Sequence, residues 1–184
     1  MMYSNYGELD EEKEDFIEIK SCVPKISIEE AIRIASKSFL KFKISSKNNV
    51  SSVKLLYKPF FLFLYRAIIK HRKYIDRPLE NITMYIAVDM ITGVGFESET
   101  LDTAIIKVEK KYVVEPLISV ENALNEVKRV ILKFKLKIAK QGLEVTEENI
   151  SPLGLVYKPI WIIEFSYRKK KKYIGVDAVK GVKV

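Results

Sequence analysis

Two short segments of this chain each occur twice, in the same order. Tyr57-Lys58-Pro59 returns as Tyr157-Lys158-Pro159, and each copy leads into an apolar stretch. Further on, Tyr85–Asp89 returns as Tyr173–Asp177, with a Gly-Val dipeptide four residues after each aspartate. Because a duplication inside one chain normally produces two copies of one structural unit, this repeat restricts the fold more than any other feature.

The spacing between matched segments differs in the two copies. Ser27 matches Ser119, Tyr57 matches Tyr157 and Asp89 matches Asp177, so that the offset changes from 92 to 100 to 88 residues. The second copy therefore has eight extra residues before its Tyr-Lys-Pro, and the first has twelve extra residues after its own. Since loops tolerate insertions better than helices or strands, we expect these insertions to lie in loops.

Each copy is predicted to begin with a helix. Ser27-Ile28-Glu29-Glu30 has the pattern of a capping box, in which the serine hydroxyl accepts a hydrogen bond from the amide three residues later. Apolar residues then recur at helical spacing as far as Phe42. The second helix is predicted to begin at Ser119 and to carry a longer apolar stripe, ending near Ile138.

Strands are predicted around these helices and after them. A proline has no amide for a ladder, so each Lys-Pro is expected to mark an edge, a bulge or a bend between two strands. A lysine-rich hairpin follows, then a return strand and an Asp-Gly turn. The predicted strands are Phe16–Lys20, Val53–Tyr57, Phe60–Ile69, Met84–Val88, Ala104–Val108, Leu153–Tyr157, Ile160–Arg168 and Tyr173–Ala178.

This order predicts an α+β fold of two tandem repeats related by pseudo-two-fold symmetry. Each repeat would pack its helix on one face of its own short antiparallel sheet. The expected divisions are an acidic, flexible arm over residues 1–15, a first repeat over 16–98 and a second repeat over 104–184. We expect the two repeats to pack together, because about 80 residues make a small core.

The hairpin pattern Tyr-x-x-Val-Asp, followed by Gly-Val, resembles the PepSY domain and the cystatin-like folds near it. The residues that carry the resemblance are Tyr85, Val88, Asp89, Gly93 and Val94, and Tyr173, Val176, Asp177, Gly181 and Val182. PepSY domains typically lie outside the membrane or beside secreted peptidases, and some restrain those enzymes. This chain shows no secretion signal and no peptidase, so the resemblance implies the fold and leaves the inhibitory role in doubt.

The residue types exclude several kinds of chemistry. Cys22 is the only cysteine and His71 the only histidine, so we expect no disulfide within the chain, no metal site and no cofactor. Asp89 and Asp177 are equivalent acids that two copies of a fold could bring together as a hydrolase dyad. Turn formation explains the same two aspartates more simply, so we expect a protein without catalytic residues.

Charge is distributed unevenly along the chain. Residues 1–20 carry a net charge of −5 and the rest a net charge of +13, which makes the acidic arm a candidate screen for a basic surface. Basic side chains gather in two predicted hairpin tips, where they could hold phosphates beside stacking aromatic rings. The candidate binding residues are Lys70, Arg72, Lys73, Arg168, Lys169, Lys170, Lys171, Lys172, Tyr57, Tyr157 and Trp161.

The same lysines have a plain structural explanation as solvated hairpin tips that protect sheet edges. We therefore expect a binding or regulatory protein whose two repeats present a surface to a protein or peptide, with nucleic-acid binding through the paired hairpins as the alternative. Homodimerisation through an exposed sheet is a further alternative. The charge and aliphatic content is typical of thermophiles, and no signal peptide or membrane span is predicted, which favours the cytoplasm.

Overall fold

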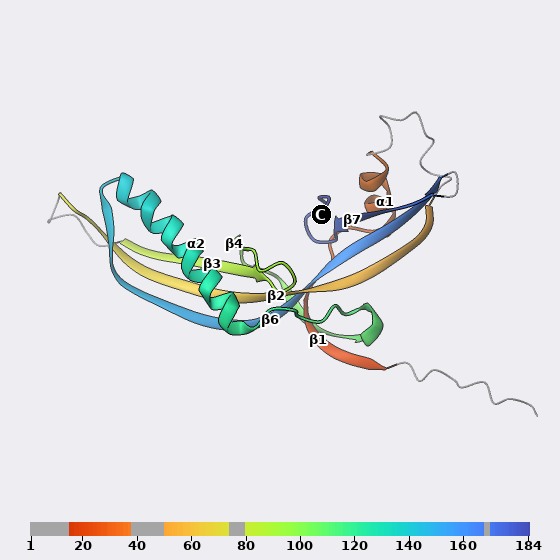
Figure 1. The fold of residues 1–184 in the computed structure, drawn as a ribbon, viewed down its shortest axis with the longest axis horizontal. Helices are drawn as coiled ribbons and strands as arrows, with labels where there is room; N and C mark the ends of the chain where they lie inside the picture. Colours follow the sequence, from red (N-terminus) through yellow and green to blue (C-terminus); the bar gives the residue numbers. More distant parts are fainter. Residues whose placement is uncertain (1–14, 38–49, 74–79, 168–169) are drawn as a thin grey trace, which may run out of the picture.

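The computed structural model describes residues 15–37, 50–73, 80–167 and 170–184 (Figure 1). Within these ranges one continuous sheet of seven strands carries two α-helices. The elements are β1 (Phe16–Cys22), α1 (Ile28–Ser36), β2 (Val50–His71), β3 (Glu80–Asp89), β4 (Gly95–Ser98), β5 (Thr103–Glu109), the 3-10 turn η3 (Lys110–Tyr112), α2 (Val120–Lys140), β6 (Leu143–Tyr167) and β7 (Lys170–Asp177).

Two unusually long strands, β2 and β6, run antiparallel to each other through the whole molecule (Figure 1). Val50 lies opposite Phe165 at one end of this ladder, His71 lies opposite Leu143 at the other, and Lys58 faces Lys158 between them. The remaining strands attach on either side in the order β4-β3-β2-β6-β1-β5, and β7 also pairs with β6. Both copies of the repeat therefore contribute to one shared sheet.

The two prolines do not interrupt these strands, so the predicted division into two strands at each Lys-Pro is wrong. Pro59 lies opposite Tyr157 within the ladder, and the three register irregularities lie elsewhere along β2. The Pro59 carbonyl accepts a hydrogen bond from the Met90 amide, just beyond the end of β3. In a strand, the N–H and C=O groups of one residue point to the same side. The missing N–H of Pro59 would therefore point toward Met90 and not toward β6, so the proline removes no hydrogen bond between β2 and β6.

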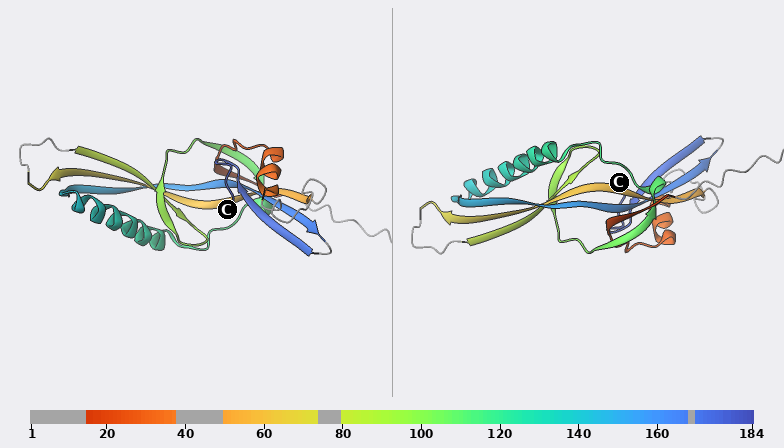
Figure 2. Two further views of the ribbon diagram at one scale, coloured as in Figure 1. Left: turned by 90° about the horizontal axis from the view of Figure 1, so that it is seen from above. Right: turned by 90° about the horizontal axis from the view of Figure 1, so that it is seen from below.

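Helix α2 belongs to the second copy of the repeat but covers strands of the first. Its buried residues Ala123, Val127 and Ile131 pack in one cluster with Phe63, Tyr65 and Ala67 of β2 and with Met84, Ile86 and Val88 of β3. Alternate residues of these strands point toward the helix, as expected for a sheet with one covered face. Figure 2 shows α2 lying along this half of the sheet.

Helix α1 makes the reciprocal contact. Ala31 and Ala35, both fully buried, pack against Ile163 and Phe165 of β6 and against β7, which belong to the second copy. The buried strand residues that each helix covers thus come from the other copy, whereas its own copy contributes partly buried ones such as Val145 of β6 and Val53 of β2. The prediction of two tandem repeats, each with a helix on its own short sheet, is therefore wrong.

Local predictions at the helix starts are confirmed. The Ser27 hydroxyl accepts a hydrogen bond from the Glu30 amide at 3.3 Å, and Ser119 accepts from the Asn122 amide at 3.2 Å. The predicted continuation of the first helix to Phe42 lies outside the described residues, as do residues 1–14 of the acidic arm predicted over residues 1–15. The strands expected before the two helices are found as β1 and β5, which pair with each other.

The exchange of helices predicts how fragments of the chain behave. A fragment of residues 16–98 should lack helical structure and a cooperative thermal transition, because α1 loses the β6 and β7 residues that it covers. Circular dichroism of this fragment, of residues 104–184 and of their equimolar mixture checks the expectation. The mixture should regain signal that neither fragment shows alone, whereas a fragment that melts cooperatively by itself would contradict it.

Candidate functional site

The repeated Tyr-Lys-Pro segments meet where β2 and β6 cross the middle of the molecule. Lys58 lies directly opposite Lys158, an arrangement that brings two like charges together. Each ammonium group contacts an aspartate at the end of the neighbouring strand: the Lys58 Nζ–Asp89 Oδ2 and Lys158 Nζ–Asp177 Oδ2 distances are both 2.5 Å. Two ion pairs therefore neutralise the crossing.

Each of these aspartates also organises a turn. Asp89 Oδ1 accepts hydrogen bonds from the Ile91 and Thr92 amides at 2.9 and 3.3 Å, and Gly93 supplies the positive φ of 73° that closes the turn. In the other copy, Asp177 Oδ1 accepts from two amides in the same way. The predicted turn role of both residues is confirmed.

The surroundings of the Asp89 carboxylate keep it ionised. Burial raises its pKa, but the hydrogen bond from Lys58 and those from the Ile91 and Thr92 amides outweigh this effect and lower the pKa below its ordinary value of 3.8. Asp177 has equivalent donors around it and is almost fully buried. In a catalytic dyad, two carboxyl groups lie close together and share one proton. Here each aspartate instead contacts its own lysine and its own turn amides, which favours a structural role over the hydrolase alternative.

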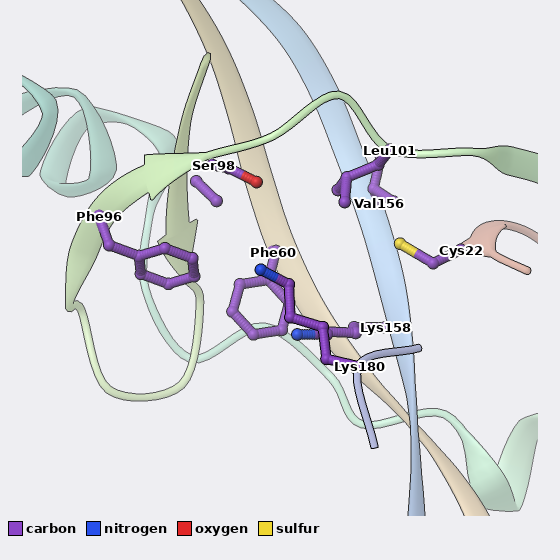
Figure 3. Close-up of a pocket in the computed structure, with 9 residues that line it drawn as sticks. Cys22, Phe60, Phe96, Ser98, Leu101, Val156, Lys158 and Lys180 are labelled. Atoms are coloured by element: carbon purple, nitrogen blue, oxygen red, sulfur yellow. The ribbon is translucent and has the colours of Figure 1, made fainter. Parts of the chain in front are cut away.

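A small cavity lies beside this crossing (Figure 3). Phe60, Phe96 and Leu101 form its apolar wall, the Cys22 sulfur lies at one side, and the Lys158 side chain also lines it. Its volume is about 40 Å³, room for a few water molecules, whereas sites for drug-sized ligands or cofactors measure roughly 300–1,000 Å³. A larger depression of about 350 Å³ over β2, β3 and β6 is shallow.

Cys22 does not have the surroundings of a reactive thiol. It is 2% exposed, and burial raises its pKa above the ordinary value of 9.0. Thiolates act as nucleophiles and metal ligands, so a raised pKa opposes both roles. Within the described ranges no group of three or more His, Cys, Asp and Glu side chains is placed to hold a metal ion.

The two predicted basic hairpins lie at opposite ends of the long strands (Figure 1). Lys70, Arg72 and Lys73 are at the end of β2, whereas Lys170–Lys172 begin β7 at the far end of the molecule. β2 has 22 residues, which at about 3.3 Å per residue separates its two ends by roughly 70 Å. The hairpins therefore do not line one groove. Arg168 and Lys169 lie outside the described residues.

Several of these basic side chains are already paired with glutamates. Lys70 and Arg72 both contact Glu144 of β6, at 3.2 and 3.4 Å, and Lys171 contacts Glu164 at 2.9 Å. These exposed ion pairs leave less positive charge for a polyanion than the sequence suggests. They join neighbouring strands at the ends of the sheet, which is the structural explanation of the lysine-rich tips.

The predicted aromatic stacking platform is largely unavailable. Tyr57 is 8% exposed, and Tyr157 is half-buried; burial raises the pKa of both hydroxyls. The Trp161 indole N–H donates to the Ile26 carbonyl at 3.0 Å, which ties β6 to the chain just before α1. These three side chains therefore stabilise the fold. They do not form a stacking surface beside the basic hairpins.

An edge strand that was not among the predicted site residues offers an open surface instead. β5 pairs with β1 and with no other described strand. Hydrogen bonds from the Val23 amide to the Asp102 carbonyl and from the Lys110 amide to the Asp15 carbonyl lie at the two ends of this ladder. Because antiparallel bonding alternates with every residue, the even-numbered residues of β5 bond to β1.

The odd-numbered residues Thr103, Ile105, Lys107 and Glu109 consequently direct their backbone N–H and C=O groups away from β1. Ile105 is 66% exposed beside this open edge. The outer edge of β7 begins with three lysines, and β4, at the other end of the strand order, is only four residues long. Lysines and short length are both devices that prevent unwanted strand pairing, and the Thr-Ala-Ile-Ile-Lys-Val-Glu sequence of β5 has only one lysine.

Comparison with known proteins identifies no relative: no protein-family model matches the chain, and no curated protein and no solved structure matches it. The PepSY-like resemblance thus stays a prediction. In the described part of the chain, no helix is long and apolar enough to cross a membrane.

The ion pair at the strand crossing predicts a dependence of stability on pH. Asp89→Asn should lower the free energy of unfolding by about 2 kcal/mol at pH 7, because a charge-assisted hydrogen bond is lost. The folded-state pKa of Asp89 lies below 3.8, so its contribution is present above that pH and is lost as the pH falls through the folded value. Urea denaturation at several pH values should show the difference from wild type shrinking below pH 3.8.

Asp102→Asn is the matched control for this measurement. Asp102 also pairs with a lysine, Lys25 at 3.2 Å, but its side chain is 78% exposed. Exposed pairs contribute little, so this variant should stay within about 0.5 kcal/mol of wild type at every pH. Equal losses in the two variants would contradict the structural role of the buried pair.

The alternation along β5 predicts opposite effects of proline at neighbouring positions. Ile105→Pro should leave the free energy of unfolding nearly unchanged, because the amide that it removes faces outward. Ile106→Pro should lower it by at least about 2 kcal/mol, because it removes a hydrogen bond to β1 and leaves a partner unsatisfied. Urea denaturation followed by circular dichroism measures both, and a reversed order would show that the alternation is assigned incorrectly.

Proposed function

We propose that this protein is a non-catalytic binding protein that takes up an extended segment of a partner protein as an additional strand on β5. The open edge of β5, which carries a single lysine, is the observation that supports the proposal. Strand addition at a sheet edge is a common mode of peptide recognition, in which main-chain hydrogen bonds supply affinity and alternate side chains supply specificity.

The length of the edge suits such a ligand. β5 is seven residues long, and its four outward-facing residues, Thr103, Ile105, Lys107 and Glu109, each present one donor and one acceptor. A partner segment of about seven residues would span this edge at about 3.4 Å per residue. The small cavity beside the strand crossing, by contrast, has too little room for a cofactor-sized ligand.

Side chains beside the edge indicate which segment would bind. Ile105 lies opposite Lys20 of β1, and Lys107 lies opposite Glu18. The side chains next to the open edge therefore include both apolar and charged groups. Phe16 is 43% exposed, and its ring lies 5.4 Å from the Lys107 ammonium group. A segment that alternates apolar and acidic residues complements this surface, because cross-strand apolar pairs and opposite charges are favourable.

Nucleic-acid binding has weaker support. It would require the basic hairpins to act together, and they lie at opposite ends of the molecule with several of their cations paired to Glu144 and Glu164. The aromatic rings that would stack on bases are partly or wholly buried.

A displayed library of random nine-residue peptides, selected on the immobilised full chain, tests the proposal. Enriched peptides should bind wild type and should lose at least tenfold in affinity for Ile105→Pro, which retains the fold but lacks one outward amide. In hydrogen exchange, a bound peptide should slow the Ile105 and Lys107 amides most strongly, because these amides gain a partner.

Lys171→Pro provides the matched control, since it places the same residue at the edge of β7. Peptide affinity should be unchanged in this variant. Peptides that bind Ile105→Pro as well as wild type would overturn the proposal, as would protection confined to the basic hairpins. A selection that enriches no peptide at all would also count against β5 as a recognition edge.

A further inference from the structure

The outer surface of α2 combines two features that do not serve the fold. The inner side of this helix is buried against β2 and β3 through Ala123, Val127 and Ile131. On the opposite side, Leu132 is 56% exposed and Leu136 is 58% exposed. In Figures 1 and 2 no helix or strand of the described ranges lies over this side of α2. At 100° per residue these two leucines lie one turn apart on the same line of the helix surface.

Cations flank this pair of leucines on both sides. Lys128 lies on one flank, and Arg129, Lys133 and Lys140 lie on the other, when residues are placed at 100° intervals around the helix. All four are exposed. Arg129 pairs with Glu126 at 3.0 Å, whereas no ion pair joins Lys128, Lys133 or Lys140 to another described residue. Exposed leucines between unneutralised cations are typical of a helix that lies on a charged apolar boundary.

The positive charge extends beyond the helix at this end of the molecule. The Arg72 amide donates to the Gly142 carbonyl at 2.9 Å, which places the end of β2 beside the chain that leaves α2. Lys73 therefore lies near the end of α2, as do Lys70 and Arg72, which share the single carboxylate of Glu144. The opposite half of α2 differs, because its exposed residues near the start include Glu121 and Asn125. The cationic, apolar surface thus lies on residues 128–140, which form about the last three and a half turns of α2.

We propose that the outer face of α2, formed by Leu132, Leu136 and the flanking cations, docks on the surface of a membrane that contains anionic lipids. The leucines would enter the boundary between headgroups and acyl chains, and the lysines would contact lipid phosphates and carboxylates. The helix would lie parallel to the surface. This surface is separate from the β5 edge, so the inference does not depend on the proposed peptide binding.

The charge and the exposed leucines of this face favour an anionic membrane over a second copy of the chain or a nucleic acid. A second copy of the chain would bring the same cations into contact, which opposes self-association through this face. A nucleic acid would use the cations but has no use for two exposed leucines, and the nearby aromatic residue Phe134 faces inward with its ring 6.1 Å from that of Tyr65. An anionic bilayer uses both features.

Co-sedimentation of the full chain with vesicles tests the inference. Vesicles of 70% phosphatidylcholine and 30% phosphatidylserine should retain the protein at physiological ionic strength, whereas pure phosphatidylcholine vesicles should retain at least tenfold less. Leu132→Asn/Leu136→Asn should bind the anionic vesicles at least tenfold more weakly, because it removes the apolar contact and keeps the charge. Both positions are exposed, so this variant should keep the wild-type fluorescence of Trp161, the only tryptophan in the chain.

Charge variants complete the design. Lys133→Gln/Lys140→Gln should weaken binding by about fivefold per lysine. Lys54→Gln/Lys170→Gln, which removes the same charge at the other end of the molecule, should weaken it much less. Equal binding by the leucine variant and wild type would overturn the inference, as would equal effects of the two lysine pairs. Failure to bind anionic vesicles would also overturn the inference, whether or not an oligonucleotide or an acidic peptide binds to this face.

Discussion

The register between β2 and β6 is the constraint on which the rest of the structure depends. With Lys58 opposite Lys158, Phe63 and Tyr65 of β2 point toward α2, and Ile163 and Phe165 of β6 point toward α1. A slip of one residue would turn Phe63 and Tyr65 away from the helix that covers them. The two Lys–Asp pairs tie each long strand to the end of its neighbour at this point, where two cations would otherwise repel each other.

Local features of the fold could be predicted from the sequence, and its topology could not. Ser27 and Ser119 cap helices as expected because a serine hydroxyl and the amide three residues later are close in the chain. Asp89 and Gly93 form a turn for the same reason. Which copy's strands α1 covers depends on contacts more than 120 residues away, such as those between Ala35 and Ile163, and an internal repeat is equally compatible with either choice.

In the candidate site, too, local features can be predicted from the sequence, whereas features that depend on the strand order cannot. The charge of Lys70 and Lys171 and their position beside strands make them candidates from sequence alone. Whether they share a groove depends on the lengths of β2 and β6, and the sequence predicts that each of these strands is divided at its proline. β5 is an edge only because β1 lies between it and β6, and that order of strands leaves no trace in the sequence of β5 itself. The exposure of Leu132 and Leu136 follows more directly, since helical spacing already places them away from the buried stripe.

The exchange of helices between the copies has a consequence for the origin of the chain. In one copy alone, most of the buried strand residues that its helix covers are missing, so two separate copies would complete these clusters by pairing as intertwined chains. Such a pair is stable only above the concentration at which two chains meet. Joining the copies in tandem removes that requirement. It also frees the two halves to differ, so that a surface such as the β5 edge needs to exist only once in the molecule.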